Sequence, residues 1–382
     1  MRSRSRILLV LFLACSAAAG CSDSANSGAT LDLATLAAPG PYAVGESQLE
    51  LVDTSRATAA NGSFAGAPER TLPTRIWYPA ETPGNGAAPS GDGPFPIIAW
   101  AHGYSSANFE GEFIGRHLAS HGYVVVGPTF PLSNGGAPGG ATIADMTNQP
   151  GDLDFVMDQV ASGAGGDALA LAIDTGKRGI AGLSLGGGTV LIGAYHPKWR
   201  IEDISAAVAL APASCFFGRD LYARSLPTLI VTGDADMLVR LDGGPRQAFE
   251  NAPPPASLVT LAGGNHVGFI GIDVAGDANS DATVGCPVIG AGGSYAATGF
   301  ATLSELLADG AGPGAVDGTS CTVGVCQEEL PQTMSAERQL EITRAAALAH
   351  FESILRGDRA AARWLESDLA DQGGDLAVAV RK

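Results

Sequence analysis

Short runs of apolar residues recur along this chain, and patterns typical of amphipathic helices separate them. The clearest runs are 97–101 and 123–126, which are apolar throughout. A strand is apolar at every position when both faces of its sheet are covered, as in a parallel sheet. Further strands are predicted at 47–52, 72–78, 178–181, 206–210, 228–232 and 258–261, and helices at 113–120, 153–160, 187–195 and 341–355. This alternation predicts an α/β fold with a mostly parallel central sheet and helices on both faces.

The first twenty residues have the layout of a secretory signal peptide. Three arginines (Arg2, Arg4 and Arg6) precede an apolar run from Ile7 to Ala19, which is too short to span a bilayer. The segment ends in Ala18-Ala19-Gly20-Cys21, a sequence that resembles a bacterial lipobox with Cys21 as the acylated residue. The alternative is a simple signal peptide that is cleaved nearby. Residues 21–40 then form a tether of small and polar residues.

The charge balance restricts the partners. The 382 residues include 22 Lys and Arg against 39 Asp and Glu, a formal net charge of −17. Without residues 1–20, which hold three arginines and no acids, 19 basic residues remain against 39 acidic ones, or −20. Binding phosphates requires a basic face, so a nucleic-acid partner is not expected. With 46% hydrophobic and only 16% charged residues, the composition also excludes a disordered chain.

Cysteine usage agrees with export. Cys15 lies in the signal segment and Cys21 at its end, which leaves four others: Cys215, Cys286, Cys321 and Cys326. An even number in an oxidising compartment predicts two disulfides, with three possible pairings. The spacing of Cys321 and Cys326 permits a small local loop, which would leave Cys215 with Cys286. The chain has no Cys-x-x-Cys pair, so a thiolate zinc site is not expected.

Residues 271–333 differ from the rest of the chain. They are rich in glycine, contain three of those four cysteines and show no periodicity, which indicates a disulfide-pinned insertion and not a second domain. Within them, Asp277-Ala278-Asn279-Ser280-Asp281 has the alternating oxygen ligands of a calcium loop. Ala282 and Val288 stand where such a loop needs Gly and Glu. We therefore expect solvated loop acids and no metal there.

The pentapeptide Gly182-Leu183-Ser184-Leu185-Gly186 has the form G-x-S-x-G. It directly follows a predicted strand and opens a predicted helix, the setting that a nucleophile elbow requires. Small residues allow the tight turn, and the turn pushes the Ser184 hydroxyl into the open. The alternative is a glycine-rich helix cap with Ser184 as the capping residue.

A serine hydroxyl needs a base to take its proton, and the base needs an acid to orient it. His266 follows the last predicted strand and is our candidate base. His102 follows an earlier strand, and the other four histidines are expected in packing or surface roles: His117, His121, His196 and His350. Asp234 and Asp236 both follow the strand at 228–232, at the sheet edge where ligand sites gather. Their spacing of two does not choose between them.

A developing oxyanion needs two backbone donors. One is the N–H of Leu185, immediately after the nucleophile. The other is expected after the strand at 97–101, where Ala101-His102-Gly103-Tyr104 offers the N–H of Tyr104.

Together these stretches resemble the α/β-hydrolases, in particular esterases similar to dienelactone hydrolase and platelet-activating-factor acetylhydrolase, and the cutinase-like polyester hydrolases. The stretches that carry the resemblance span residues 42–356: Arg75 to Pro79, Ala101 to Tyr104, Leu118 to Tyr123, Gly182 to Gly188, Gly233 to Asp236, and Asn265-His266. The resemblance implies that Asp236 is the acid and that no cofactor is needed. Leu183 departs from the His or Trp that often precedes the nucleophile.

We therefore predict an exported, lipid-anchored serine esterase whose partner is a small or polymeric ester and whose contact with a membrane is through Cys21. Only 16 residues separate Ala211 from Thr228, too few for a large lid, so Pro131 to Pro150 and the insertion would wall an open site. The expected organisation is a signal peptide (1–20), a tether (21–40), a hydrolase domain (41–360) and a tail (361–382). A polyester hydrolase is the alternative within the enzymes, and a non-catalytic binding lipoprotein of the same fold is the alternative outside them.

Overall fold

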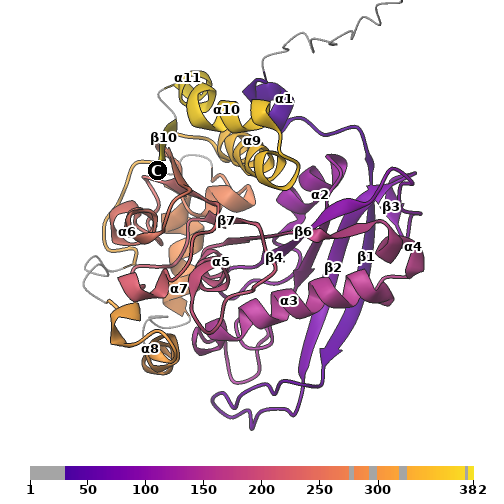
Figure 1. Cartoon of the computed structure of the whole chain (residues 1–382). Helices are drawn as coiled ribbons and strands as arrows, with labels where there is room; N and C mark the ends of the chain where they lie inside the picture. Colours follow the sequence, from indigo (N-terminus) through magenta and orange to yellow (C-terminus); the bar gives the residue numbers. More distant parts are fainter. Residues whose placement is uncertain (1–30, 275–278, 292–298, 318–324, 375–376) are drawn as a thin grey trace, which may run out of the picture. The chain divides into compact units, whose positions relative to one another are not determined.

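A ten-stranded sheet runs through the part of the chain that the structure, a computed structural model, describes: residues 31–274, 279–291, 299–317, 325–374 and 377–382 (Figure 1). Its strand order is β10-β9-β8-β7-β6-β4-β5-β2-β1-β3. The strands are β1 Ala43–Asp53, β2 Arg70–Ala80, β3 Gly84–Asn85, β4 Phe95–Ala101, β5 Val124–Pro128, β6 Ile173–Leu183, β7 Ala206–Leu210, β8 Thr228–Gly233, β9 Ala256–Leu261 and β10 Ala377–Arg381. Neighbours from β5 through β4 and β6 to β9 are parallel, whereas β2 is antiparallel to β1 and β5, and β10 to β9. The expected mostly parallel sheet is confirmed.

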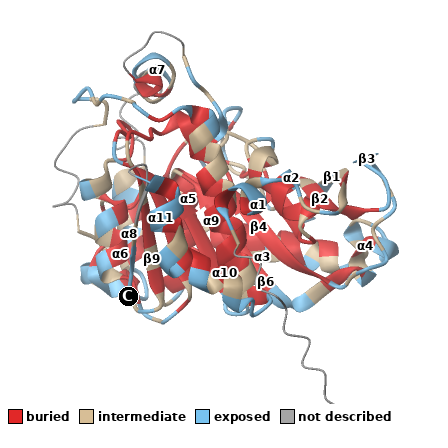
Figure 2. Cartoon of the chain, turned by 90° about the horizontal axis from the view of Figure 1, so that it is seen from above, coloured by how far each residue is buried: buried red, intermediate tan, exposed pale blue. Residues whose placement is uncertain are grey.

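Helices cover both faces of this sheet (Figure 1). The helices are α1 Leu33–Ala37, α2 Glu112–Ser120, α3 Gln149–Gln159, α4 Asp167–Leu171, α5 Leu185–Tyr195, α6 Pro245–Asn251, α7 Cys286–Ala291, α8 Phe300–Ala308, α9 Ala336–Leu355, α10 Arg359–Arg363 and α11 Leu369–Gly373. Buried side chains of α1, α2, α9 and α10 pack on one face, and those of α3, α5, α6 and α8 on the other. In Figure 2 the central strands are buried, and exposed residues gather on the outer helices and loops.

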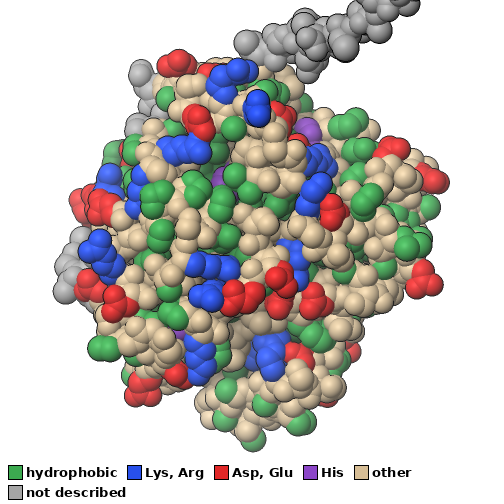
Figure 3. All heavy atoms as spheres, in the orientation of Figure 1, with side chains coloured by type: hydrophobic (Ala, Val, Ile, Leu, Met, Phe, Trp, Pro, Cys, Tyr) green, Lys and Arg blue, Asp and Glu red, His purple; other side chains and the backbone are tan. Residues whose placement is uncertain are grey.

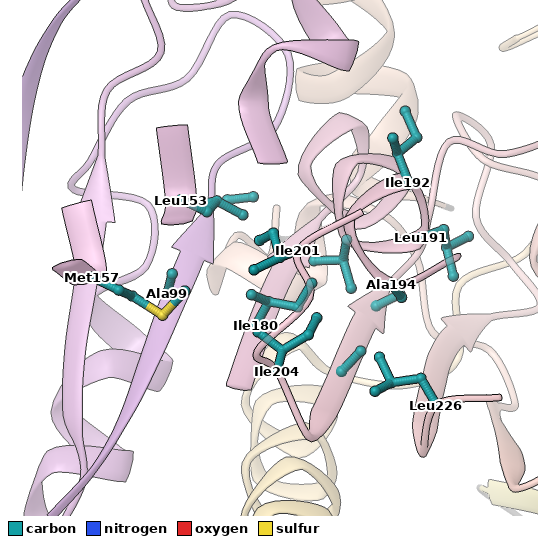
Figure 4. Close-up of a cluster of buried hydrophobic side chains, with 14 of the residues drawn as sticks. Ala99, Leu153, Met157, Ile180, Leu191, Ile192, Ala194, Ile201, Ile204 and Leu226 are labelled. Atoms are coloured by element: carbon teal, nitrogen blue, oxygen red, sulfur yellow. The ribbon is translucent and has the colours of Figure 1, made fainter. Parts of the chain in front are cut away.

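Alternation along β4 explains why this strand is apolar at every position. Ile97 and Ala99 belong to the cluster beneath α3 and α5, whereas Ile98 and Trp100 belong to the cluster beneath α2 and α9. Successive side chains of a strand point to opposite faces, so a central strand must supply both cores. Figure 4 shows part of the first cluster, in which Leu153 and Met157 of α3 lie near Ala99.

The start of the globular part differs from the sequence prediction. The tether was expected to extend to residue 40, but residues 33–37 form α1, with Leu33 and Leu36 buried against α9. Asp32 caps this helix by accepting a hydrogen bond from Thr35 N at 2.7 Å. Two leucines three positions apart, preceded by a capping aspartate, are the sequence signal for this helix.

The C-terminal residues also differ from the predicted tail. Beyond residue 360 the chain continues into α11 and into β10, which pairs with β9 at the edge of the sheet. Trp364 is fully buried, and its Nε1 donates to Gln372 Oε1 at 2.9 Å. The same Gln372 oxygen accepts from Leu33 N at 2.8 Å, so it joins the first helix to the last.

A buried ion network connects the antiparallel part of the sheet to the helical layer. Arg70 on β2 is fully buried and donates to both carboxylate oxygens of Asp152 on α3, at 2.7 and 2.6 Å, and of Asp145, at 3.1 and 2.8 Å. Burial alone would lower the pKa of Arg70, but the two carboxylates raise it above its usual value. Several other ion pairs lie at the surface, where basic and acidic side chains are neighbours (Figure 3).

We expect Arg70→Leu to lower the free energy of unfolding by about 3–5 kcal/mol, because buried Asp145 would lose its cationic partner and buried Asp152 would keep only Arg56. Arg116→Leu is the matched control, since Arg116 is exposed and pairs with Glu46 at the surface. The control should lose less than about 1 kcal/mol. Denaturant unfolding of both variants measures this, and equal losses would contradict the role assigned to Arg70.

Candidate active site

Ser184 occupies the single-residue connection between β6 and α5. Its backbone has φ 59° and ψ −117°, a conformation that residues with a side chain rarely adopt. Leu183 and Leu185 on either side are buried, whereas Ser184 remains partly exposed. This strained turn between a strand and a helix is the geometry expected of a nucleophile elbow.

Two glycines of the pentapeptide are required by close approach of backbones. A Cβ on Gly186 would lie 2.0 Å from the carbonyl oxygen of Ala101, and one on Gly182 would lie 2.8 Å from the same oxygen. Real Cβ atoms do not come so near, so only glycine lets the chain pass the end of β4 at this distance. The turn therefore brings Ser184 against the loop that follows β4.

That loop, residues 102–104, is held by His102. The His102 Nε2 accepts a hydrogen bond from Phe130 N at 3.0 Å, and its Nδ1 lies 2.7 Å from the Gly103 carbonyl oxygen. Burial lowers the pKa of His102 to about 4, so the ring is neutral and donates through Nδ1. A Cβ on Gly103 would lie 3.4 Å from Ser184 Cβ, which places the loop beside the serine.

Glu110 is an acid beside this loop that the sequence reading missed. Both of its carboxylate oxygens accept from Gly103 N, at 2.9 and 3.1 Å. Burial raises the pKa of Glu110 to about 7, although hydrogen bonds from Ser106 and Gly103 and the charge of His266 oppose the rise. No motif marked this residue, because a glutamate seven positions after a glycine is an ordinary loop feature.

Asp236 and His266 form a hydrogen-bonded pair. Asp236 Oδ2 lies 2.8 Å from His266 Nδ1, and the two residues are 1% and 7% exposed. The other oxygen, Oδ1, accepts from Leu238 N and Val239 N at 2.8 and 2.6 Å, so the carboxylate has one orientation. Asp234, the other candidate, is exposed and accepts from Gly263 N at 2.6 Å, which makes it a residue of the turn.

The surrounding charges set the protonation of His266. Burial alone would lower its pKa, but the charge and hydrogen bond of Asp236, together with Asp281 and Glu110, raise the pKa of His266 to about 9. The folded-state pKa thus exceeds the unfolded value of about 6.5. The stabilisation that this pair contributes is complete below about pH 6.5 and is lost as the pH rises through about 9.

The remaining histidines lie elsewhere in the fold. His196 follows α5 and its Nε2 lies 2.9 Å from Leu307 O of α8. His117 on α2 is buried and its ring contacts that of His121. His350 is buried on α9.

The expectation of solvated acids at 277–281 is wrong for Asp281, which is fully buried. Asp281 accepts three backbone hydrogen bonds, from Met237, His266 and Val267. Asn279 Oδ1 accepts from Asp281 N and Asn265 Nδ2, so protein donors already occupy the oxygens that a cation would need. Asp277 lies outside the described residues. Among the side chains that the structure describes, no group of three or more His, Cys, Asp or Glu could hold a metal.

The cysteine pairing also differs from the local loop considered above. Cys286 is bonded to Cys326, 40 positions along the chain, with a Cα–Cα distance of 5.8 Å. Cys321 lies outside the described residues. A spacing of five permits a local loop but does not require one, since the sequence does not show that residues 286 and 326 are brought together.

Comparison with known proteins identifies the family. The sequence model of the PET hydrolase-like family (PETase) matches residues 53–266, more than half of the chain. The chain belongs to this family. The PET hydrolase-like match begins at the end of β1 and stops at His266, so it contains Ser184 and Asp236 and precedes the insertion.

Two proteins similar to this PET hydrolase-like chain are also named as hydrolases of esters. A bis(hydroxyethyl) terephthalate hydrolase of Streptomyces coelicolor is 27% identical over 264 residues, which cover 64% of this chain and 74% of that protein. Cutinase 2 of Thermobifida cellulosilytica is 25% identical over 187 residues, covering 49% of this chain and 61% of the cutinase.

The fold has a solved counterpart. A ferulic acid esterase from Streptomyces cinnamoneus superposes with a TM-score of 0.54 at 20% identity, covering 85% of this chain and 93% of that one. The chain is thus a carboxylic ester hydrolase with the α/β-hydrolase fold.

We expect the imidazole of His266 to titrate with a midpoint near pH 9, and the midpoint to fall by more than about one pH unit in Asp236→Asn. The shift follows because the neutral amide no longer stabilises the imidazolium, while Asp281 and Glu110 still face it. NMR titration of the histidine ring protons measures both values. His350 is the internal control: burial lowers its pKa to about 4, and Asp236→Asn should leave its signal unchanged. Identical His266 midpoints in both proteins would contradict the pairing.

Proposed function

We propose that this carboxylic ester hydrolase is an exported serine esterase with Ser184, His266 and Asp236 as its catalytic triad. The observation that carries the proposal is the 2.8 Å contact between Asp236 Oδ2 and His266 Nδ1. These two residues follow β8 and β9, and Ser184 follows β6, in parallel strands whose carboxyl ends share one edge of the sheet. Ligand sites of open α/β sheets lie at this edge.

The reaction proceeds in two halves. Ser184 Oγ attacks the ester carbonyl carbon while His266 Nε2 takes the hydroxyl proton, and Asp236 holds the ring through Nδ1. His266 then gives that proton to the leaving alkoxide, which departs as the alcohol and leaves an acyl-enzyme. Water, deprotonated by the same histidine, attacks the acyl carbon, and the bond from that carbon to Ser184 Oγ breaks. His266 returns the proton to Oγ, which frees Ser184 and releases the acid product.

The oxyanion of each tetrahedral intermediate requires backbone donors. Leu185 is the first residue of α5, so its N–H has no acceptor within the helix and lies at the positive end of the helix dipole. Tyr104 would supply the second N–H, from the loop that His102 holds in place. One such donor contributes about 3 kcal/mol to lowering a barrier of this kind.

Small or extended esters fit the architecture. The connection from β7 to β8, residues 211–227, is described throughout and contains one short helical turn, Arg219–Leu221. It is too short for a helical lid over Ser184. A polyester hydrolase is the second candidate, favoured by the family match and by the relative named for bis(hydroxyethyl) terephthalate.

Export and lipid attachment complete the proposal. Residues 1–30, which hold the signal-like segment and Cys21, lie outside the described part of the chain. The described helices include none that is long and apolar enough to cross a membrane. The proposal rests on the three early arginines, the apolar run and the Cys21 motif.

Ser184→Ala is expected to reduce hydrolysis of p-nitrophenyl esters by at least about 10³-fold, because no other group replaces the nucleophile. The series should run from acetate to long acyl chains and include bis(hydroxyethyl) terephthalate and a polyester film. Ser353→Ala on α9 is the matched control, since its hydroxyl donates to His350 O within the same helix and α9 carries no residue of the proposed triad. A wild type as inert as Ser184→Ala on every ester would favour the binding lipoprotein instead.

Cys21→Ser is expected to abolish incorporation of labelled fatty acid when the full chain is expressed in a bacterial host, since acylation needs the thiol. Cys15→Ser is the control, because it changes a cysteine within the expected signal segment. The label should persist in that control. Wild-type protein that is free of label and released into the medium would show a simple signal peptide.

A further inference from the structure

One buried carboxylate connects the two loops that carry the Asp236–His266 pair. We call residues 234–239 the acid loop and residues 263–267 the base loop. Asp281 Oδ2 accepts from Met237 N of the acid loop at 2.9 Å and from His266 N of the base loop at 3.0 Å. Its Oδ1 accepts from Val267 N at 2.8 Å. Three charge-assisted hydrogen bonds to one fully buried carboxylate therefore fix the loops relative to each other.

Packing around Asp281 supports the same arrangement. Asp281 begins a helical turn, Asp281–Gly285, that lies against both loops. A Cβ on Gly285 would lie 2.9 Å from a methyl of Leu238 in the acid loop and 3.1 Å from a methyl of Val267 in the base loop. The turn thus fills the space between the loops, with glycine at the tightest point.

Further hydrogen bonds hold the turn in place. Asn279 Nδ2 donates to Ala235 O at 2.7 Å, and Asn279 Oδ1 accepts from Asp281 N at 2.9 Å. The disulfide between Cys286 and Cys326 follows immediately, and Cys326 N donates to Met237 O at 2.9 Å. Hydrogen bonds from Asn279 and Cys326 therefore attach both sides of the disulfide to the acid loop.

We propose that Asp281 is a positioning residue of this esterase, which sets both the geometry of the Asp236–His266 pair and the negative charge around it. The inference rests on the proposed role of that pair in catalysis. Asp281 touches no reacting atom and acts through the backbone of the two loops. Residues 279–286 of the predicted insertion then support the Asp236–His266 pair through the backbone of the two loops. They lie beyond the stretch that the family model matches.

The charge of Asp281 has its own consequence. The acids that face His266 are Asp236, Asp281 and Glu110, and each favours the imidazolium. Removing one of these charges makes the protonated ring less stable, so the free base appears at lower pH. A residue with a purely structural role would not move this titration.

The test is Asp281→Asn, which keeps the size of the side chain but loses the charge and turns an NH₂ group toward a backbone donor. We expect kcat to fall about 10- to 100-fold with KM changed less than about twofold, since the defect lies in alignment and not in substrate binding. The acidic limb of the kcat/KM profile should move down by about half a pH unit. Rates are divided by the fraction of protein labelled by a fluorophosphonate, so that misfolded protein does not count.

Asp273→Asn is the matched control, because Asp273 is an exposed acid of the same segment whose oxygens accept from Gln332 Nε2 and Ala336 N. It should keep the wild-type kcat and pH profile. Asp281→Glu, which retains the charge on a longer side chain, should keep the wild-type limb while kcat stays reduced. The inference is overturned if Asp281→Asn keeps the wild-type kcat per labelled site and the acidic limb of its kcat/KM profile lies at the wild-type pH.

A second variant covers the case in which Asp281→Asn does not fold. The added methyl of Gly285→Ala would displace Leu238 and Val267 without changing any charge. We therefore expect kcat per labelled site to fall, while the acidic limb of the kcat/KM profile keeps its wild-type pH. An unchanged kcat would overturn the inference. Failure of the proposed function gives a different result, since wild-type protein would then carry no label or Ser184→Ala would remain active.

Discussion

The close passage of the chain over the end of β4 is the constraint on which the rest of the site depends. Gly186 lies so near Ala101 O that a methyl group would stand 2.0 Å from it, and this contact sets where α5 begins. Because α5 begins there, Ser184 must adopt a positive φ, and the loop after β4 must run beside it. The parallel sheet then brings the residues that follow β8 and β9 to the same edge. The strain at Ser184 is maintained by packing on both sides of the turn.

Polar interactions hold the loops of this edge, whereas apolar packing holds the sheet. His102, Glu110 and Asp281 each satisfy backbone groups of a loop that could not be buried without partners. A hydrogen bond to a charged acceptor is directional and short, so it fixes a loop more sharply than methyl contacts do. The same carboxylates also supply the electrostatic field at His266. Glu110 and Asp281 thus hold the loops at this edge of the sheet and also raise the pKa of His266.

Much of this arrangement was predictable from the sequence, because it follows from local patterns. Apolar runs gave the strands from β4 to β9, and the G-x-S-x-G turn and the order of Ser184, Asp236 and His266 along the chain gave the candidate triad. The residues alone do not show which of Asp234 and Asp236 is the acid, because both lie on the same side of an extended chain. In the structure Asp234 accepts a hydrogen bond from Gly263 N, whereas Asp236 contacts His266. The sequence predicts a solvated Asp281 because its burial depends on Met237 and His266, which lie 44 and 15 positions away and which no periodicity connects to it. The tail and α1 were missed for a similar reason, as Gln372 joins them across the whole length of the chain.

The clustering of acids around His266 has a chemical meaning within the proposed mechanism. A base with a raised pKa is a stronger proton acceptor, but less of it is free at neutral pH. Asp236 must raise the pKa in order to orient the ring and stabilise the imidazolium that forms during attack. Glu110, whose own pKa lies near 7, loses its charge as the solution becomes acidic, which partly relieves that effect on His266. Burial and the charge of Asp236 raise the pKa of Asp281, whereas the charge of His266 and the backbone donors oppose the rise. Its carboxylate accepts three backbone hydrogen bonds from two loops, so it connects those loops as well as contributing charge. The two acids that no motif indicates would thus act in different ways: Glu110 as a titrating neighbour, and Asp281 as a charge that also holds two loops together.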